Sequence, residues 1–149
     1  GRKETLEVEG SGLVAAYIHT GAKVGVLAEV GATKDDTVHH ESFKSLVKDI
    51  TLQIAAANPS AVSRDQVDPA LVAKEKEIAA EQFKHKPAQA VEKIVEGKME
   101  KFYQGICLVD QGFVKNGELT VKEHLAAVGK EIGDELSIRR FLRFQVGEG

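Results

Sequence analysis

Residues 10–30 read GSGLVAAYIHTGAKVGVLAEV, and this stretch decides between two folds. One interpretation makes it the phosphate-binding loop of a dinucleotide-binding domain, because residues 10–15 match the pattern G-x-G-x-x-A. Glu29 follows Gly10 by 19 positions, close to the spacing at which such a domain places the carboxylate that binds the ribose. The other interpretation makes residues 13–20 and 23–30 two strands separated by a turn-prone Thr-Gly-Ala.

The spacing favours the pair of strands. Only eight residues, 13–20, lie between the glycines and the turn, whereas a parallel crossover needs a dozen or more residues and usually a helix. The downstream sequence also lacks the alternating strand and helix patterns of a doubly wound sheet. We therefore expect an antiparallel hairpin. An NAD(P)-binding enzyme domain that uses Gly-Ser-Gly-Leu-Val-Ala as its phosphate loop is the alternative.

Strand patterns also occur at both ends of the chain. Residues 5–10 alternate apolar and polar side chains, and residues 136–147 do the same. Alternation in the second segment puts four apolar side chains on one face and four mostly polar neighbours on the other: Ile138, Leu142, Phe144 and Val146 against Arg139, Phe141, Arg143 and Gln145. Arg140 then falls on the apolar face, which indicates either a strand end or a buried partner.

Helical periodicity fills the middle of the chain. Apolar residues recur every three or four positions between Phe43 and Ile54, which predicts an amphipathic helix of about five turns. Asp36 or Thr37 could cap its start, and Asn58-Pro59 should end it.

Three further helices have clear start signals. Asp68-Pro69 combines an N-cap acceptor with proline at the first helical position. Pro87 should stop that helix and open the next, and we expect these two helices to pair as an antiparallel hairpin. The last helix starts at the capping box Thr120-x-x-Glu123. The predicted fold is α+β, with an antiparallel sheet packed with several helices.

Composition limits the classes of function. The 149 residues suit one compact domain, and a formal net charge of −3 argues against a general nucleic-acid binder. The single cysteine, Cys107, excludes an internal disulfide. No apolar run approaches the roughly 20 residues of a membrane-spanning helix, so we expect no membrane contact.

Other residues that suggest chemistry have simpler explanations. His39 and His40 are adjacent and would point to different sides of a helix, and no histidine has the spaced companions of a metal site. We expect no metal, no cofactor and no catalytic residue. The arginines and aromatic residues of RRFLRF, residues 139–144, resemble an RNA-binding strand, so a structural or RNA-associated module is a further alternative.

The segment AAYIHTGAKVGVLAEV resembles a hairpin of the translation elongation factor Ts family. Similarity continues through FKSLVKDITLQIAAANP, EKIVEGKMEKFYQGICLVDQGFV and IGDELSIRRFLRFQVGEG, in the same order as in that family. The resemblance implies a three-stranded antiparallel sheet with helices on one side. It also implies one core domain over residues 1–149, without the amino-terminal helical domain of the family.

The resemblance implies a function without covalent chemistry. Members of this family act on elongation factor Tu as guanine-nucleotide exchange factors, so we expect this chain to bind the GDP-bound form and promote GDP release by stabilising the nucleotide-free state. The chain itself would bind no nucleotide and would not be an enzyme. The family also implies a homodimer or a second Ts-type unit as partner, and the bacterial cytoplasm as location, with mitochondrion or plastid as the alternative.

Two loops are implied to touch elongation factor Tu. The family's Thr-Asp-Phe-Val loop aligns with residues 34–37, where Asp35 matches the acid and Asp36 replaces the intruding phenylalanine. Both aspartates could instead cap the following helix. The family's Ile-Gly-Glu-Asn loop is partly kept as Ile132-Gly133-Asp134, although Gly133 could simply be the glycine that ends a helix.

A second contact region is implied by the hairpin tip and one helix. His19, Thr20 and Gly21 form the tip, and Lys48 aligns with a helix position that faces the partner in longer family members. The alternative for His19 is an exposed turn residue.

Overall fold

The computed structural model describes residues 10–19 and 24–145. The strand expected over residues 5–10, the turn at residues 20–22 and Val146 lie essentially outside these ranges. The chain divides into two compact units, Gly1–Asn58 with Gly112–Gly149, and Pro59–Gln111. Each unit is described by itself.

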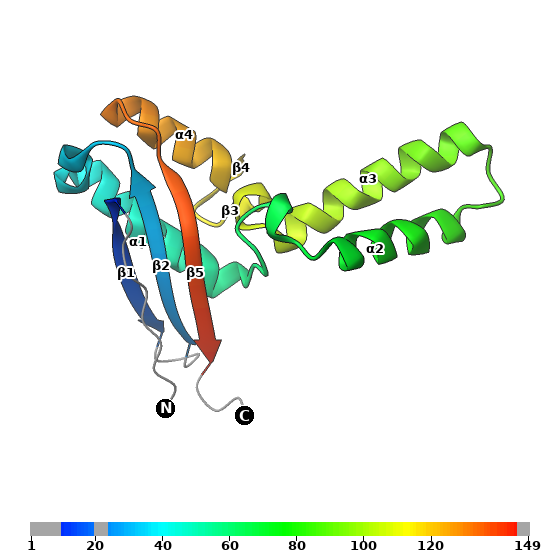
Figure 1. The fold of residues 1–149 in the computed structure, drawn as a ribbon, viewed down its shortest axis with the longest axis horizontal. Helices are drawn as coiled ribbons and strands as arrows, with labels where there is room; N and C mark the ends of the chain where they lie inside the picture. Colours follow the sequence, from blue (N-terminus) through cyan, green and yellow to red (C-terminus); the bar gives the residue numbers. More distant parts are fainter. Residues whose placement is uncertain (1–9, 20–23, 146–149) are drawn as a thin grey trace. The chain divides into compact units, whose positions relative to one another are not determined.

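The first unit is built on a three-stranded antiparallel sheet. Strands β1 (Ser11–His19), β2 (Val24–Ala32) and β5 (Ser137–Gln145) lie in the order β1-β2-β5. Helix α1 (Glu41–Ala57) covers one face of this sheet (Figure 1). The opening stretch therefore forms two paired antiparallel strands, and the α+β expectation is confirmed.

The core lies between α1 and the central strand. Every second side chain of β2 points toward α1. These side chains pack against the apolar side chains on the face of α1 that covers the sheet. The fully buried members are Val26, Ala28, Val30, Phe43, Leu46, Ile50 and Ile54. Asn58 ends α1 in the left-handed conformation, as Asn58-Pro59 predicted.

The predicted cap of α1 is wrong. Residues Asp35–His39 form a short 3₁₀ helix, η1, and α1 begins only at Glu41, with His40 as an N-cap that makes no side-chain hydrogen bond. Neither Asp36 nor Thr37 caps α1, because η1 separates them from its first turn.

The assignment of faces in β5 also needs correction. Glu29 pairs with Arg140 but Val30 pairs with Ile138, so Arg139 is an extra residue in a β-bulge. The bulge reverses the alternation, and Ile138 therefore shares the helix-covered face with Phe141 and Arg143. Leu142 and Phe144 lie on the opposite face.

Helix α4 (Val121–Ile132) packs against α1, and it begins at the capping box of Thr120 and Glu123 as predicted. A two-stranded sheet, β3 (Gly112–Phe113) with β4 (Asn116–Thr120), precedes it and was not expected. The buried amide of Gln53 fixes this small sheet to α1, donating to the carbonyl of Gly112 at 3.0 Å and accepting from the Val114 amide at 2.8 Å.

The second unit is a helical hairpin. Helices α2 (Pro69–Gln82) and α3 (Ala88–Ile106) pack side by side, with the Asp68 carboxylate accepting from the Ala70 amide at the start of α2. The predicted antiparallel pair of helices is confirmed.

At the base of the hairpin, the short helices η2 (Arg64–Gln66) and η3 (Leu108–Asp110) join a small core around Ala61, Val67 and Cys107. Arg64 connects this base to α3 because its guanidinium binds the Glu100 carboxylate at 2.7 Å and Asp110 at 3.0 Å.

Candidate partner-binding site

One carboxylate joins two loops that lie about a hundred residues apart in the sequence. The Asp134 carboxylate accepts hydrogen bonds from the backbone amides of Thr33 and Lys34, each at 3.1 Å, and from the Thr37 hydroxyl at 2.6 Å. The Thr33 hydroxyl also donates to it. We call residues 33–37 together with 132–134 the loop edge; its two segments meet at the end of the sheet where β2 finishes and β5 begins (Figure 1).

The end of α4 aims Asp134 at this position. Gly133 ends the helix with φ of 86°, a conformation that favours glycine, and the amides of Gly133 and Asp134 both donate to the Gly129 carbonyl. Lys34 closes the contact by donating from Nζ to the Gly133 carbonyl at 2.7 Å. Gly133 is thus a helix-ending glycine and part of the loop edge at once.

Hydrogen bonds keep Asp134 ionised. Those from Thr33 and then Thr37 hold the pKa of the Asp134 carboxyl well below its usual range. A charged carboxylate that accepts several hydrogen bonds is a strong and directional anchor. The loop edge is therefore a fixed surface rather than a pair of independent loops.

The two aspartates at the start of η1 are exposed at this surface. The Asp35 carboxylate accepts from the Ser11 hydroxyl, which ties η1 to the first residue of β1. The Asp36 side chain is 90% exposed and stands 3.7 Å from Nε2 of His40. Asp36 can therefore face a partner, and the contact that it would give up is an exposed one with His40.

The structure brings together four of the eight predicted site residues. Asp35, Asp36, Ile132 and Gly133 all belong to the loop edge. His19 lies at the other end of β1, and Lys48 is exposed in the middle of α1, where it lines a groove of about 300 Å³ between α1 and β1. Thr20 and Gly21 lie outside the described residues.

Asp134 and Thr37 lie in the two loops that the resemblance implied, but their contact with each other, and the contact of Asp134 with Thr33, were not predicted. Their contacts join segments about a hundred positions apart, and no local spacing signals such a contact.

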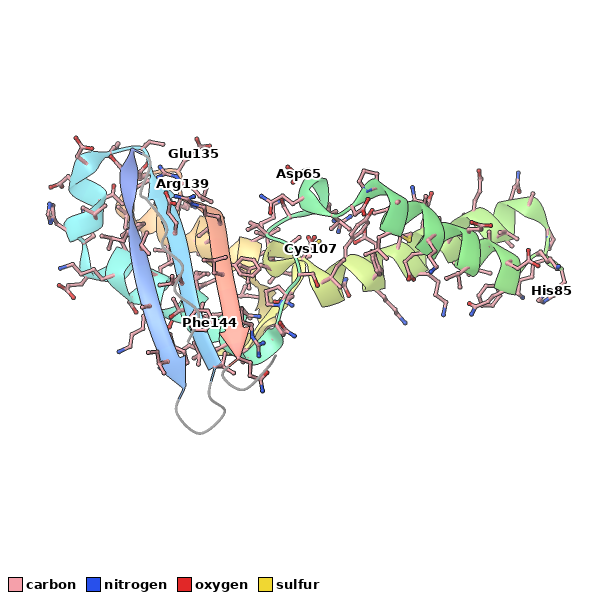
Figure 2. The ribbon with its side chains drawn as sticks, turned by 60° about the horizontal axis from the view of Figure 1, so that its bottom comes forward. Asp65, His85, Cys107, Glu135, Arg139 and Phe144 are labelled. Carbon is pink, nitrogen blue, oxygen red and sulfur yellow. The ribbon has the colours of Figure 1, made fainter. Side chains whose placement is uncertain are left out.

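A second cluster consists of the buried Glu29 carboxylate and two arginines of β5. In the sequence, only the position of Arg140 on an apolar face had indicated a buried partner. Glu29 is only 1% exposed, and it accepts from Nη1 of Arg139 at 2.9 Å and from Nε of Arg140 at 2.8 Å. Arg139 also donates to the Ser11 carbonyl at 2.7 Å. Figure 2 shows Arg139 at the start of β5, close to the loop-edge end of the sheet. The buried-partner interpretation of Arg140 is confirmed.

The glycines of the opening stretch make room for this cluster. A Cβ on Gly31 would lie 2.3 Å from Nε of Arg139, and a Cβ on its strand partner Gly12 would also meet the Arg139 side chain. Gly12 therefore sits in a strand under a guanidinium, and Glu29 is occupied by two arginines. This geometry does not support the phosphate-loop alternative.

Two residues of the segment that suggested an RNA-binding strand face the helix-covered side of the sheet. Phe141 pairs with the buried Ala28 on the helix-covered face, and Arg143 donates to the Ala55 carbonyl of α1 at 3.2 Å. These two side chains consequently face the inside of the unit, whereas base stacking needs exposed aromatic rings.

The described part of the chain offers no metal site and no membrane-spanning helix. Within residues 10–19 and 24–145, no group of three or more histidine, cysteine, aspartate or glutamate side chains could hold a metal ion. No helix of this described part has the length and apolar character needed to cross a bilayer.

Comparison with known proteins gives the family. The sequence model of the family described as Elongation factor TS matches residues 1–148. The elongation factor Ts of Alkaliphilus oremlandii is 48% identical over 149 residues, covering 99% of this chain and 68% of the relative. That of Alkaliphilus metalliredigens is 46% identical, with 99% and 69% covered. That of Geotalea daltonii is 47% identical over 140 residues, with 93% and 65% covered.

This chain belongs to the elongation factor Ts family. By that family and by the names of its relatives, it is counted among the translation elongation factors.

Proposed function

We propose that the chain is a guanine-nucleotide exchange factor that binds elongation factor Tu and promotes the release of GDP. It acts by binding and not by covalent chemistry, and it holds neither nucleotide nor cofactor itself. Membership of the elongation factor Ts family supports this proposal. By the same reasoning its place of action is the bacterial cytoplasm, because the relatives named above are bacterial proteins.

The physical basis of exchange is linkage. An exchange protein that binds the nucleotide-free GTPase more tightly than the nucleotide-bound GTPase must lower the affinity for the nucleotide by the same ratio. About 4 kcal/mol of such coupling corresponds to roughly three decades in nucleotide affinity. Incoming GTP then displaces the factor by the same reciprocity.

The loop edge is the observation that carries the proposal. Asp134 holds its two segments in one arrangement before any partner arrives, so association loses little conformational entropy there. The exposed Asp35 and Asp36 would meet the GTPase together with Ile132 and Gly133.

Asp36 changes the kind of contact that we propose. A carboxylate cannot enter an apolar pocket as a phenylalanine can, because its desolvation costs too much free energy. We therefore assign Asp36 to a polar or basic patch of elongation factor Tu. His19, Thr20, Gly21 and Lys48 are assigned to a second contact region on the same partner.

The test measures the release of fluorescent GDP from elongation factor Tu with increasing amounts of the full chain. Acceleration is expected, with a decrease of roughly tenfold or more for Asp36→Lys, which reverses a charge at the contact. Glu118→Lys is the matched control, since Glu118 is exposed on β4 away from the loop edge. The proposal is wrong if the chain leaves GDP release unchanged at every concentration.

We also propose a homodimer or a pair with a second Ts-type unit. The sheet face opposite α1 carries apolar side chains from all three strands, namely Ala16, Ile18, Leu27, Leu142 and Phe144. Ile18 is 72% exposed, and an exposed apolar patch of this kind marks an interaction surface.

A further inference from the structure

Strand β1 forms one edge of the three-stranded sheet. Among the described residues only β2 pairs with it, and no strand lies along its other side. Natural proteins protect such edges with charged residues, prolines, bulges or very short strands, because an open edge pairs readily with another extended chain. β1 has none of these protections: it is nine residues long, residues 11–18 contain no charged residue or proline, and its register with β2 has no bulge.

The opposite edge of the same sheet is protected. Strand β5 carries Arg139, Arg140 and Arg143, and the bulge at Arg139 shifts its register with β2. The two edges therefore differ, and only β1 keeps the regular, uncharged form that accepts a further strand.

A groove lies beside the open edge. It has a volume of about 300 Å³ and is lined by residues 13–17 of β1 and by Lys44, Val47, Lys48 and Thr51 of α1. We call it the edge groove.

The sheet is incompletely covered at this edge. Leu13 and Ala15 of β1 face α1 but are only half-buried, whereas their pairing partners on β2, Val30 and Ala28, are 0% exposed. The α1-facing side chains of an added strand would therefore fill the edge groove and complete the cover of β1.

The charge of the edge groove is positive. Its lining holds two lysines, Lys44 and Lys48, and no carboxylate. Lys44 lies 3.6 Å from the exposed Glu41 carboxylate outside the lining, a surface contact that contributes little. Among the described residues Lys48 takes part in no salt bridge. Acidic side chains in the groove would gain from both lysines.

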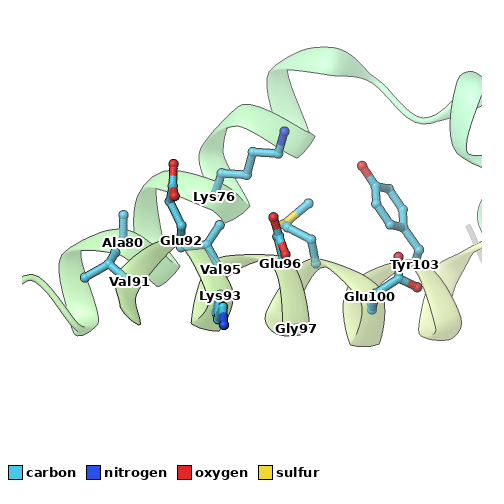
Figure 3. A pocket seen from close by; sticks show the side chains of 11 residues that line it. Lys76, Ala80, Val91, Glu92, Lys93, Val95, Glu96, Gly97, Glu100 and Tyr103 are labelled. Atoms are coloured by element: carbon cyan, nitrogen blue, oxygen red, sulfur yellow. The ribbon is translucent and has the colours of Figure 1, made fainter. Parts of the chain in front are cut away.

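The larger groove of the second unit lacks both features. It has about 910 Å³ and runs along helices α2 and α3 (Figure 3). Its lining carries both signs of charge, Lys76 and Lys93 with Glu92 and Glu96, and its walls are helices, whose backbone groups pair within the helix. Nothing about this larger groove selects an occupant.

We propose that an extended segment of a partner protein adds to the sheet along β1, with acidic side chains toward Lys44 and Lys48 and apolar side chains on the face of Val14 and Ala16. Backbone hydrogen bonds to residues 12–16 supply affinity, and the alternating side chains supply specificity. The inference deepens the second contact region that contains Lys48. Only the identity of the partner, elongation factor Tu, rests on the proposed function.

A second copy of this chain fits the edge less well. Pairing of β1 with β1 across a two-fold axis sets the same patch against itself, so the lysines of both copies would gather at one rim. An acidic segment of another protein satisfies the open backbone and the two lysines together.

The experiment uses the full chain and four synthetic peptides of eight residues. The first alternates valine and glutamate, and the second has lysine for glutamate. The third and fourth repeat the first with N-methyl groups on the valine nitrogens or on the glutamate nitrogens. Isothermal titration gives the affinity, and NMR reports the amide signals of Val14 and Ala16.

The glutamate peptide should bind with a Kd of roughly 10–100 μM and shift both amide signals, and the lysine peptide should bind at least tenfold more weakly. A paired strand turns the backbone groups of only every second residue toward its neighbour. One N-methylated peptide should therefore lose at least tenfold in affinity while the other binds almost normally. Equal effects of the two methylations contradict strand addition.

Charge reversal gives an independent arm. Lys44→Glu combined with Lys48→Glu should weaken binding of the glutamate peptide by roughly tenfold or more. The control is Lys74→Glu combined with Lys101→Glu, because both lysines are exposed on α2 and α3 and the net charge changes equally. Equal affinities of the two double variants contradict the assigned role of the lysines.

Two other occupants of the edge have their own outcomes. Failure of the full chain to bind the glutamate peptide overturns the proposal, including the case in which residues 1–9 hold the edge. Slower amide exchange at Val14 and Ala16 with rising concentration of a Leu142→Lys variant, without peptide, would assign the edge to a second copy and overturn it too. No arm measures GDP release, so each of these failures leaves the proposed exchange activity untouched.

Discussion

Asp134 is the residue on which the shape of the loop edge depends. It bonds to Thr33, Lys34 and Thr37 and so links the end of α4 to the segment after β2. Because these hydrogen bonds lower the pKa of its carboxyl, the unfolded state binds a proton more readily than the folded state. The stability that Asp134 supplies is therefore present above pH of about 4 and is lost as pH falls toward the lowered pKa.

Asp134→Asn should remove this pH dependence. The amide keeps the size of the side chain but cannot carry the charge, and its NH₂ group faces donors that need an acceptor. The free energy of unfolding, measured in urea between about pH 3 and 7, should fall less steeply toward acid in the variant. Amide hydrogen exchange at Thr33 and Lys34 should become faster. An identical acid slope in both proteins contradicts this role for Asp134.

Glu29→Gln tests the buried cluster. The change leaves Arg139 and Arg140 without their anionic partner, and the side chain that replaces Glu29 is almost completely buried. Since both arginines remain partly exposed to water, we expect a loss of about 2–4 kcal/mol rather than the larger values of fully buried pairs.

The matched control for Glu29 is Glu135→Gln. Glu135 is an exposed carboxylate at the same end of β5, and its change should stay within about 0.5 kcal/mol (Figure 2). Urea unfolding of both variants measures the difference. A cost below about 1 kcal/mol for Glu29→Gln would show that the cluster is not a main support of the sheet.

At the scale of elements, helix α4 is the support of the loop edge. Its start is fixed by the reciprocal capping box, in which Thr120 Oγ1 accepts from the Glu123 amide at 3.1 Å and Glu123 accepts from the Thr120 amide at 2.9 Å. Its end is fixed by Gly133, and Asp134 follows directly. Both ends of this helix are thus specified by residues next to it in the chain.

Thr120→Ala should cost about 1 kcal/mol in the free energy of unfolding, because the Glu123 amide loses its acceptor. Thr120→Ser keeps the hydroxyl and should recover most of that loss. Chemical denaturation of the three proteins provides the comparison. If alanine and serine give equal stability, the capping box contributes nothing measurable here.

Local signals predicted most elements and failed at particular ones. Caps and proline placed α2, α3 and α4, since these signals act within a few residues. The cap of α1 was wrong because residues 35–39 form η1, and α1 begins only at Glu41. The faces of β5 were wrong because the bulge at Arg139 lets two consecutive arginines reach Glu29.

At the scale of the whole molecule, the uncovered face of the sheet bears on assembly. Leu142 lies on this face in the edge strand β5, where it pairs with Leu27 of the central strand β2. If two copies associate through this face, Leu142→Lys should weaken association by at least tenfold, since two lysines would be buried in the interface.

Sedimentation equilibrium over a range of concentrations measures this association. Val114→Lys is the control, because Val114 is an exposed apolar residue in the turn between β3 and β4, away from this face. A wild-type chain that stays monomeric at every concentration, or a Leu142→Lys variant that still dimerises, contradicts the proposed surface.

The sequence by itself determined the α+β class, the hairpin of the opening stretch, the three helices with clear start signals, and the family. These features depend on the periodicity of apolar residues and on contacts between residues close together in the chain, so the sequence alone indicates them. Tertiary structure alone decided that residues 33–37 and 132–134 form one edge, that Glu29 holds two arginines, and that a groove stays open between α2 and α3. Each of these arises from side chains far apart in the chain, whose meeting depends on how complete elements pack.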